Sequence, residues 1–181
     1  VIERGDSRRH LPWNLGQFGS NTSYTMSRTN YAGAMDAKMK LLEIAAMDLG
    51  GNAEDYDVGD DKVFSKTSPK KNLTFAQAAQ RAIELGGKYS GEEMNEDMHS
   101  ITKASVTALA GTGLIGAAKD KYPTKGLPPA LASSFIKIEL DVETGKFEII
   151  DYVGTADCGT VIHPQGLEHQ TALVRISNHE Y

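Results

Sequence analysis

A loop crowded with glycine, serine and threonine, residues 16–29, is the part of the sequence best suited to chemistry. It carries one arginine, Arg28, and leads into an apolar periodic segment that predicts a helix over residues 30–49. Backbone N–H groups at a helix N-terminus and the helix dipole both favour negative charge. The guanidinium of Arg28 could hold a phosphate through two hydrogen bonds, or could instead bind carbonyls of the loop. The pattern predicts a site for an anion or a phosphate.

Few other residues have the types and spacing that chemistry requires. The histidines form no metal-binding pattern such as H-E-x-x-H, and a solvated or hydrogen-bonded imidazole is the favoured interpretation for each. They are His10, His99, His163, His169 and His179. Cys158 is the single cysteine, which excludes an internal disulfide and favours a small buried residue over a nucleophile.

One glycine motif offers a rival function. Residues 111–116 match G-x-G-x-x-G and follow a plausible strand, which is typical of dinucleotide-binding turns. However, the helix that should follow would end before Pro123, and no acidic residue closes a second strand about 20 residues further on. A glycine-rich turn with small-residue packing is therefore favoured, and nucleotide binding at residues 111–116 stays open as an alternative.

The opening loop must be positioned by the helix that follows it. Residues 1–29 predict the end of a strand and a long loop, and the helix over residues 30–49 is closed by Gly50. Its predicted apolar face repeats at spacings of four and three, through Met35, Met39, Leu42, Ala46 and Leu49.

The middle of the chain predicts a loop and a second helix. Residues 52–72 are polar and predict a loop with at most a short strand near Val63. Thr74 and Gln77 form a capping box, which predicts a helix that ends near Leu85.

The rest of the chain predicts mainly strands. Residues 88–100 read as an acidic loop and residues 104–110 as a strand, and residues 136–153 alternate as a hairpin with its turn at 141–146. A helix should resume at Pro164. Helices and antiparallel strands in separate blocks predict an α+β fold, with no evident domain boundary.

Size and charge limit the possible partners. The chain has 181 residues and a net charge of −5, without a basic stripe, which argues against a nucleic-acid partner. No stretch approaches the roughly 20 apolar residues of a membrane span. The chain begins without Met and without a signal peptide, so we expect a piece of a longer protein. We expect the cytoplasm, with which the lone cysteine is compatible, and the periplasm stays open because a targeting signal on a missing N-terminus would not be visible here.

Two ordered motifs resemble a known family. The first runs from Gly5-Asp6 through residues 16–20 and Ser27-Arg28-Thr29 to Gly33-Ala34 and a helix ending at Gly50. The second runs from the hairpin at residues 138–145 to the turn at residues 156–164. Over residues 1–170 the chain resembles part of the molybdenum-binding subunit of the xanthine dehydrogenase/aldehyde oxidoreductase family, the molybdenum hydroxylases.

The resemblance implies a fold and a cofactor site. It implies a fragment of a molybdopterin-binding domain, with helices packed on a mixed or antiparallel sheet. In this family the corresponding loop and helix start wrap the pterin and its phosphate or dinucleotide tail, and the nucleotide form stays open here. The implied cofactor-binding residues are Ser23, Thr25, Met26, Ser27, Arg28 and Thr29. The dithiolene sulfurs of the cofactor hold molybdenum in this family, so no protein metal ligand is expected.

The resemblance also implies an activity that this chain cannot complete alone. The family hydroxylates aldehydes or nitrogen heteroaromatics, passing electrons to iron–sulfur clusters and usually FAD. Its glutamate base lies in a Gly-Glu motif near the family's C-terminus, and no such motif stands near the C-terminal end of this sequence, so no catalytic residue is expected here. The remaining domains of the molybdenum subunit, and iron–sulfur and flavin domains or subunits, are the expected partners, with a small molecule as substrate.

Some residues depart from the family pattern. His163 stands where the family has Asn before Pro164, and residues 171–181 read as an atypical or non-native tail rather than a glycine-rich helix. A binding or interaction domain that keeps this fold without the cofactor therefore stays open as a second alternative.

Overall fold

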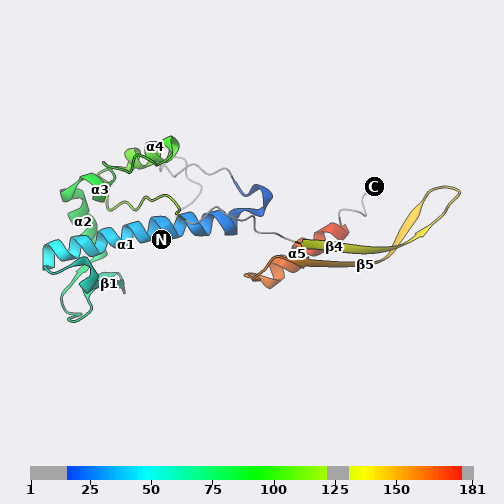
Figure 1. The fold of residues 1–181 in the computed structure, drawn as a ribbon, viewed down its shortest axis with the longest axis horizontal. Coiled ribbons are helices and arrows are strands. Elements are labelled where there is room, and N and C mark those ends of the chain that lie inside the picture. The colour runs from blue at the N-terminus through cyan, green and yellow to red at the C-terminus, as the bar shows by residue number, and fades with distance from the viewer. Residues whose placement is uncertain (1–15, 122–130, 177–181) are drawn as a thin grey trace. The chain divides into compact units, whose positions relative to one another are not determined.

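The chain divides into two compact units. The computed structural model describes residues 16–121 and 131–176. Unit 1 covers Val1–Pro123 and unit 2 covers Thr124–Tyr181, a division that the sequence did not indicate. Unit 1 combines several helices with a small antiparallel sheet and unit 2 combines one described helix with another, which confirms the predicted α+β class (Figure 1).

The longest helix organises unit 1. Helix α1 spans Ser27–Leu49 and ends at Gly50, whose φ of 79° and N–H bond to the Ala46 carbonyl confirm the predicted C-terminus. The predicted start was wrong, because a π-helical turn, η3 (Thr22–Met26), runs directly into α1. The predicted apolar face reaches the core only in its C-terminal part. Leu42 is buried, but Met35 and Met39 are exposed.

A three-stranded sheet packs on the C-terminal half of α1. Strands β1 (Tyr56–Gly59), β2 (Lys62–Ser65) and β3 (Asn72–Thr74) pair antiparallel in that order. The sequence indicated only β2. The tight β1–β2 turn uses Asp60 and Asp61 at positive φ, and two consecutive aspartates are a weaker hairpin signal than Asn-Gly. Tyr56 and Val63 join the core formed with Leu42 and Ala45.

Two short helices cover another side of α1. Helix α2 (Phe75–Leu85) begins at the predicted capping box, in which Thr74 Oγ1 accepts the Gln77 N–H. Its small residues Ala78 and Ala82 pack against Ile44 of α1. Helix α3 (Gly87–Ser90) follows directly. Residues 88–90, which were predicted as the beginning of a loop over residues 88–100, are therefore helical.

The predicted strand at residues 104–110 is wrong. Residues Ser100–Leu109 form helix α4, whose first turn is capped by His99, since its Nδ1 accepts the Ile101 N–H at 3.2 Å. A short run of small and apolar residues cannot be assigned by periodicity alone, and here Val106 is the residue that the helix buries.

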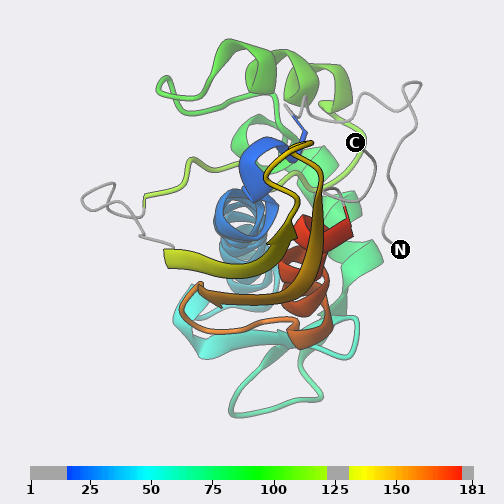
Figure 2. The ribbon, with the colours of Figure 1, turned by 90° about the vertical axis from the view of Figure 1, so that its right-hand side faces the viewer.

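Unit 2 is a long hairpin and a helix. Strands β4 (Leu131–Leu140) and β5 (Phe147–Asp157) pair antiparallel, with a register shift between Lys137 and Ile138. The Asp141 carboxylate organises the turn, where hydrogen bonds from the Thr144 side chain and from the backbone N–H groups of Glu143 and Thr144 lower its pKa. Helix α5 (Pro164–Ile176) begins at the predicted proline and contacts β5 (Figure 2). The boundary proposed at residues 170 and 171 falls within α5, and the nature of the tail stays a prediction.

A carboxylate on α1 ties α3 to the core of unit 1 and should give acid-dependent stability. Glu43 Oε2 lies 2.7 Å from Lys88 Nζ and accepts the Tyr89 hydroxyl at 2.9 Å. Burial raises the pKa of Glu43, but the hydrogen bonds from Lys88 and Tyr89 outweigh it and lower the pKa below the ordinary 4.5. The stabilisation is therefore present above pH 4.5 and is lost as pH falls through the lowered pKa of the folded state.

We expect Glu43→Gln to lower the free energy of unfolding by up to about 1 kcal/mol near neutral pH, because the ion pair is partly exposed. The difference from the unchanged chain should vanish in acid. Urea unfolding followed by circular dichroism across pH 3–7 checks this, with the exposed Glu96→Gln as control. A Glu43→Gln deficit that persists unchanged at pH 3 would contradict this assignment.

Candidate functional site

The six cofactor-binding residues implied by the sequence lie on one continuous helical run. Ser23, Thr25 and Met26 belong to η3, while Ser27, Arg28 and Thr29 form the first turn of α1. The predicted loop over residues 22–29 is therefore wrong. The N–H groups at the helix start are those of residues 22–24, because the Thr25 N–H already donates to the Asn21 carbonyl at 2.8 Å.

The hydroxyl groups of this helical start bond back to carbonyls of the preceding turn. The Thr25 hydroxyl donates to the Asn21 carbonyl at 2.8 Å, and the Ser27 hydroxyl donates to the Ser23 carbonyl. The Thr29 hydroxyl donates to the Thr25 carbonyl at 3.2 Å. Bonds to the carbonyl four residues earlier let serine and threonine lie within a helix. A hydroxyl whose proton is used in this way offers its lone pairs to N–H or O–H groups of a ligand.

Arg28 is held from two directions. Its Nε lies 2.7 Å from Asp120 Oδ2, and the two side chains are 19% and 20% exposed. Its guanidinium carbon lies 5.2 Å from the centre of the Tyr24 ring, within the range of a cation–π contact. The sequence left open an anion site or a contact with loop carbonyls. The observed partners, a carboxylate and an aromatic ring, do not decide between these two interpretations. They fix the orientation of a cation at the start of α1.

Asn21 offers a buried acceptor that sequence reasoning missed. Its Oδ1 is buried and accepts no hydrogen bond from any residue within the described ranges. A buried polar atom without a partner costs free energy, so such an atom points to a ligand or water that completes it. The available signal was its position immediately before a run of Ser and Thr at a helix start.

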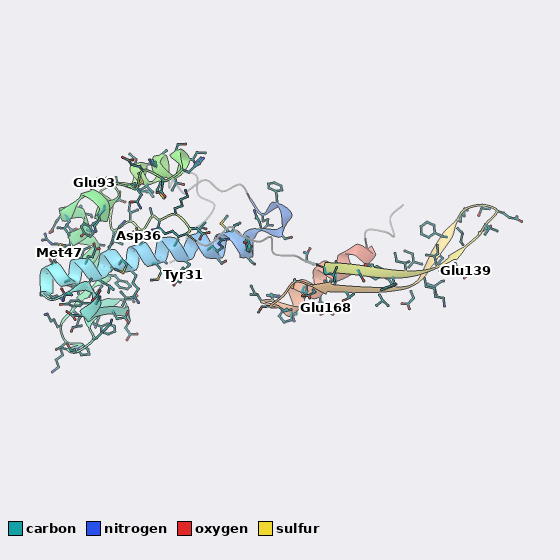
Figure 3. The ribbon with its side chains drawn as sticks, in the orientation of Figure 1. Tyr31, Asp36, Met47, Glu93, Glu139 and Glu168 are labelled. Atoms are coloured by element: carbon teal, nitrogen blue, oxygen red, sulfur yellow. The ribbon has the colours of Figure 1, made fainter. Side chains whose placement is uncertain are left out.

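An apolar groove borders the Arg28–Asp120 pair. Tyr31, Met35 and Met39 project from α1 and, with residues 118–121, line a groove of about 490 Å³. Figure 3 shows Tyr31 and Asp36 on the N-terminal half of α1. Asp120 both lines the groove and binds Arg28. Aromatic and thioether side chains of this kind suit a flat ring system.

Residues 111–116 do not have the geometry of a dinucleotide-binding turn. Helix α4 precedes them where the fingerprint requires a strand, and residues 117–121 after them have no regular structure. Gly116 instead approaches α1 so closely that a Cβ would lie 2.4 Å from the Gly33 carbonyl oxygen. The turn with small-residue packing is therefore confirmed, and the nucleotide-binding alternative is wrong.

The remaining candidates have structural roles or none. Cys158 is exposed, which corrects the buried position expected for it. The Nδ1 atom of His163 accepts the Gly166 N–H at 2.8 Å and so supports the start of α5.

Within residues 16–121 and 131–176 no three His, Cys, Asp or Glu side chains are grouped to hold a metal ion. No helix in these two ranges is long and apolar enough to cross a membrane. His10, His179 and the Gly5-Asp6 part of the first motif lie outside the described residues.

Comparisons with known proteins give one family. The model of the molybdopterin cofactor-binding domain matches residues 1–172. A solved structure, the Cu,Mo-CO dehydrogenase in its carbon monoxide reduced state, is similar with 24% identity and a TM-score of 0.45. The similarity covers 88% of this chain and 17% of that one. A search of curated proteins finds no match.

Proposed function

Because this chain belongs to the family of molybdopterin cofactor-binding domains, we propose that residues 21–29 form part of the surface that holds molybdopterin in a larger molybdenum hydroxylase. The observation that carries the proposal is Arg28, a cation oriented by Asp120 and Tyr24 at the start of α1. An oriented guanidinium suits the phosphate of the pterin, in its mononucleotide or dinucleotide form.

The residues present fit the chemistry of this cofactor. A pterin carries ring N–H and amino groups that donate hydrogen bonds, and Asn21 Oδ1 is a buried acceptor without a partner among the described residues. The back-bonded hydroxyls of Ser27 and Thr29 present lone pairs to similar donors. The groove beside Asp120 offers apolar contact to a flat ring. When bound, the cofactor supplies molybdenum redox chemistry, while this chain binds and orients it.

The finer assignment is to the xanthine dehydrogenase/aldehyde oxidoreductase type. In this proposal the whole enzyme hydroxylates an aldehyde or a nitrogen heteroaromatic in the cytoplasm, and other domains or subunits supply its iron–sulfur clusters and FAD. The motifs at residues 16–34 and 138–164 support this assignment. The chain spans 17% of the solved structure to which it is similar, so the catalytic base and most of the substrate pocket are assigned to the rest of the assembly.

One observation favours the cofactor-free alternative, an interaction domain with the same fold. The carboxylate of Asp120 already neutralises Arg28, so this side chain has a charge partner without any ligand. Such a domain would keep the Arg28–Asp120 pair for stability alone. Variants of Arg28 therefore distinguish the two functions.

We expect Arg28→Ala to reduce molybdenum bound per folded chain at least about tenfold, because a hydrogen-bonded charge pair with a phosphate is lost. The fold should remain, since Arg28 lies at the edge of the core. Elemental mass spectrometry on the preparation with its copurifying chains measures the metal. Arg81→Ala is the matched control, because Arg81 also pairs with carboxylates, those of Asp48 and Glu84, on the far half of α1 and on α2.

Unchanged molybdenum in Arg28→Ala would contradict the cofactor role. So would a variant that unfolds while the molybdenum per folded molecule stays the same. Either result would favour the interaction domain.

A further inference from the structure

A buried lysine and an aspartate attach residues 115–117 to α1. The ammonium group of Lys40, which is 8% exposed, donates to the Ile115 carbonyl at 2.8 Å and lies 2.7 Å from Asp36 Oδ2. The same carboxylate oxygen accepts the Ala117 N–H at 2.9 Å. Charge-assisted bonds of this kind are stronger than neutral ones, and burial makes their loss costly. The two side chains therefore fix both the position and the direction of the segment.

Two glycines bring the segment into backbone contact with the helix. A Cβ on Gly116 would lie 2.4 Å from the Gly33 carbonyl oxygen and 2.7 Å from the Ala37 Cβ, so the backbone of the segment lies directly on α1. Ile115 meets α1 at Lys40, and Gly116 meets it at Gly33 and Ala37. The segment therefore runs toward the N-terminus of α1.

This direction delivers a carboxylate to the candidate site. Asp120 follows the attached residues and meets Arg28, about two helical turns before Asp36. Extended chain covers about 3.3 Å per residue, so the three steps from Ala117 to Asp120 span a comparable length of helix. The position of Asp120 is thus a consequence of the attachment at Asp36, Lys40 and Gly116.

We propose that Asp120 is a positioning residue, which orients the Arg28 guanidinium toward the anionic end of the cofactor. This inference rests on the proposed function. Asp120 Oδ2 forms an ion pair at 2.7 Å from the Nε atom of the guanidinium, and the Tyr24 ring lies beside the guanidinium. Arginine carries further N–H donors on its two Nη atoms, which a phosphate can bind in a fork. Fixing a long, freely rotating side chain before binding lowers the entropy lost when the ligand arrives.

A purely stabilising role accounts less well for this pair. Both side chains are about a fifth exposed, and ion pairs that reach solvent contribute little to stability. The segment is already attached through Lys40, Asp36 and Gly116, so it does not need Asp120 to stay in place. The contact of the Asp120 carboxylate with Arg28 limits the direction in which this guanidinium points.

The test compares the rate at which molybdenum is lost on dialysis from the intact preparation with its copurifying chains. We expect Asp120→Asn to lose molybdenum about tenfold faster, because the guanidinium is no longer held. Its unfolding midpoint should stay within error of the unchanged chain. Asp120→Glu, which keeps the carboxylate, should lose molybdenum more slowly than Asp120→Asn. Asp97→Asn is the matched control, because Asp97 pairs only loosely with the neighbouring Lys119, at 3.9 Å.

The double variant decides whether Asp120 acts through Arg28. In the Arg28→Ala background, Asp120→Asn should cause no further loss, because there is no guanidinium left to orient. A further, additive loss would overturn the positioning role. So would unchanged retention in Asp120→Asn alongside rapid loss in Arg28→Ala, a result that leaves the proposed function intact. An Asp120→Asn chain that fails to fold would also overturn it. Unchanged retention in Arg28→Ala would overturn the proposed function itself, and this inference with it.

Discussion

Replacing Gly116 with alanine is expected to lower the free energy of unfolding of unit 1 by about 2–3 kcal/mol, because overpacking at a backbone contact cannot be relieved by a side-chain movement. The new Cβ would lie 2.4 Å from the Gly33 carbonyl oxygen, 2.7 Å from the Ala37 Cβ and 3.0 Å from the Ala37 nitrogen. These atoms belong to the middle of α1, so either the helix bends or residues 115–120 move away from it.

Urea unfolding of the full chain, followed by circular dichroism, measures this loss. Gly113→Ala is the matched control, because a Cβ at Gly113 has no atom within 4 Å. Equal stabilities for the two alanine variants would show that the segment is not packed on α1 as described. Gly116→Ala should also lose molybdenum, since it displaces Asp120 from Arg28.

The second large effect is expected at Ile44, which is 0% exposed where α1 meets α2. Ile44→Ala should lower the free energy of unfolding by about 2–5 kcal/mol, because it leaves a cavity between Ala78 and Ala82, whose side chains are too short to fill it. Molybdenum per folded chain should stay unchanged, since Ile44 lies on the half of α1 away from Arg28.

The control for Ile44 is Met47→Ala on the same helix, because Met47 is exposed (Figure 3). Urea unfolding should find less than about 0.5 kcal/mol for Met47→Ala. If the two substitutions had similar costs, the core would not lie where α2 packs on α1. If Ile44→Ala also released molybdenum from folded chains, the core and the site would be coupled, contrary to this account.

Elements with local signals could be predicted from the sequence. The Thr74 capping box, the Gly50 helix end, the hairpin turn after Asp141 and the start of α5 at Pro164 each depend on a few neighbouring residues. Their hydrogen bonds form within a few positions of the signal, so no tertiary contact is needed to decide them.

Other elements could not be predicted because distant packing decides them. Strands β1 and β3 form by pairing with β2 on α1. In α4 the side chain of Val106 is buried by other parts of unit 1. Met35 and Met39 follow the period of a core face, yet no core covers them, and they line the groove instead. Periodicity predicts which side chains share a face, but not what lies opposite.

In the candidate site, too, local signals could be predicted from the sequence and contacts between distant residues could not. Arg28 was identified from its type and its place before a helix, and Tyr24 lies one turn away. Asp120 carries no signal that links it to Arg28, because the link depends on Lys40, Asp36 and Gly116 together. The composition of residues 22–29 predicts a loop, whereas these residues are helical and their serine and threonine hydroxyls bond to earlier carbonyls.

The most direct test of the central claim is the molybdenum content of the native preparation, measured by elemental mass spectrometry with whatever chains copurify. We expect about one molybdenum atom per chain, together with the pterin that carries it. A value near zero with the copurifying chains present would contradict the cofactor-binding function and favour the interaction domain.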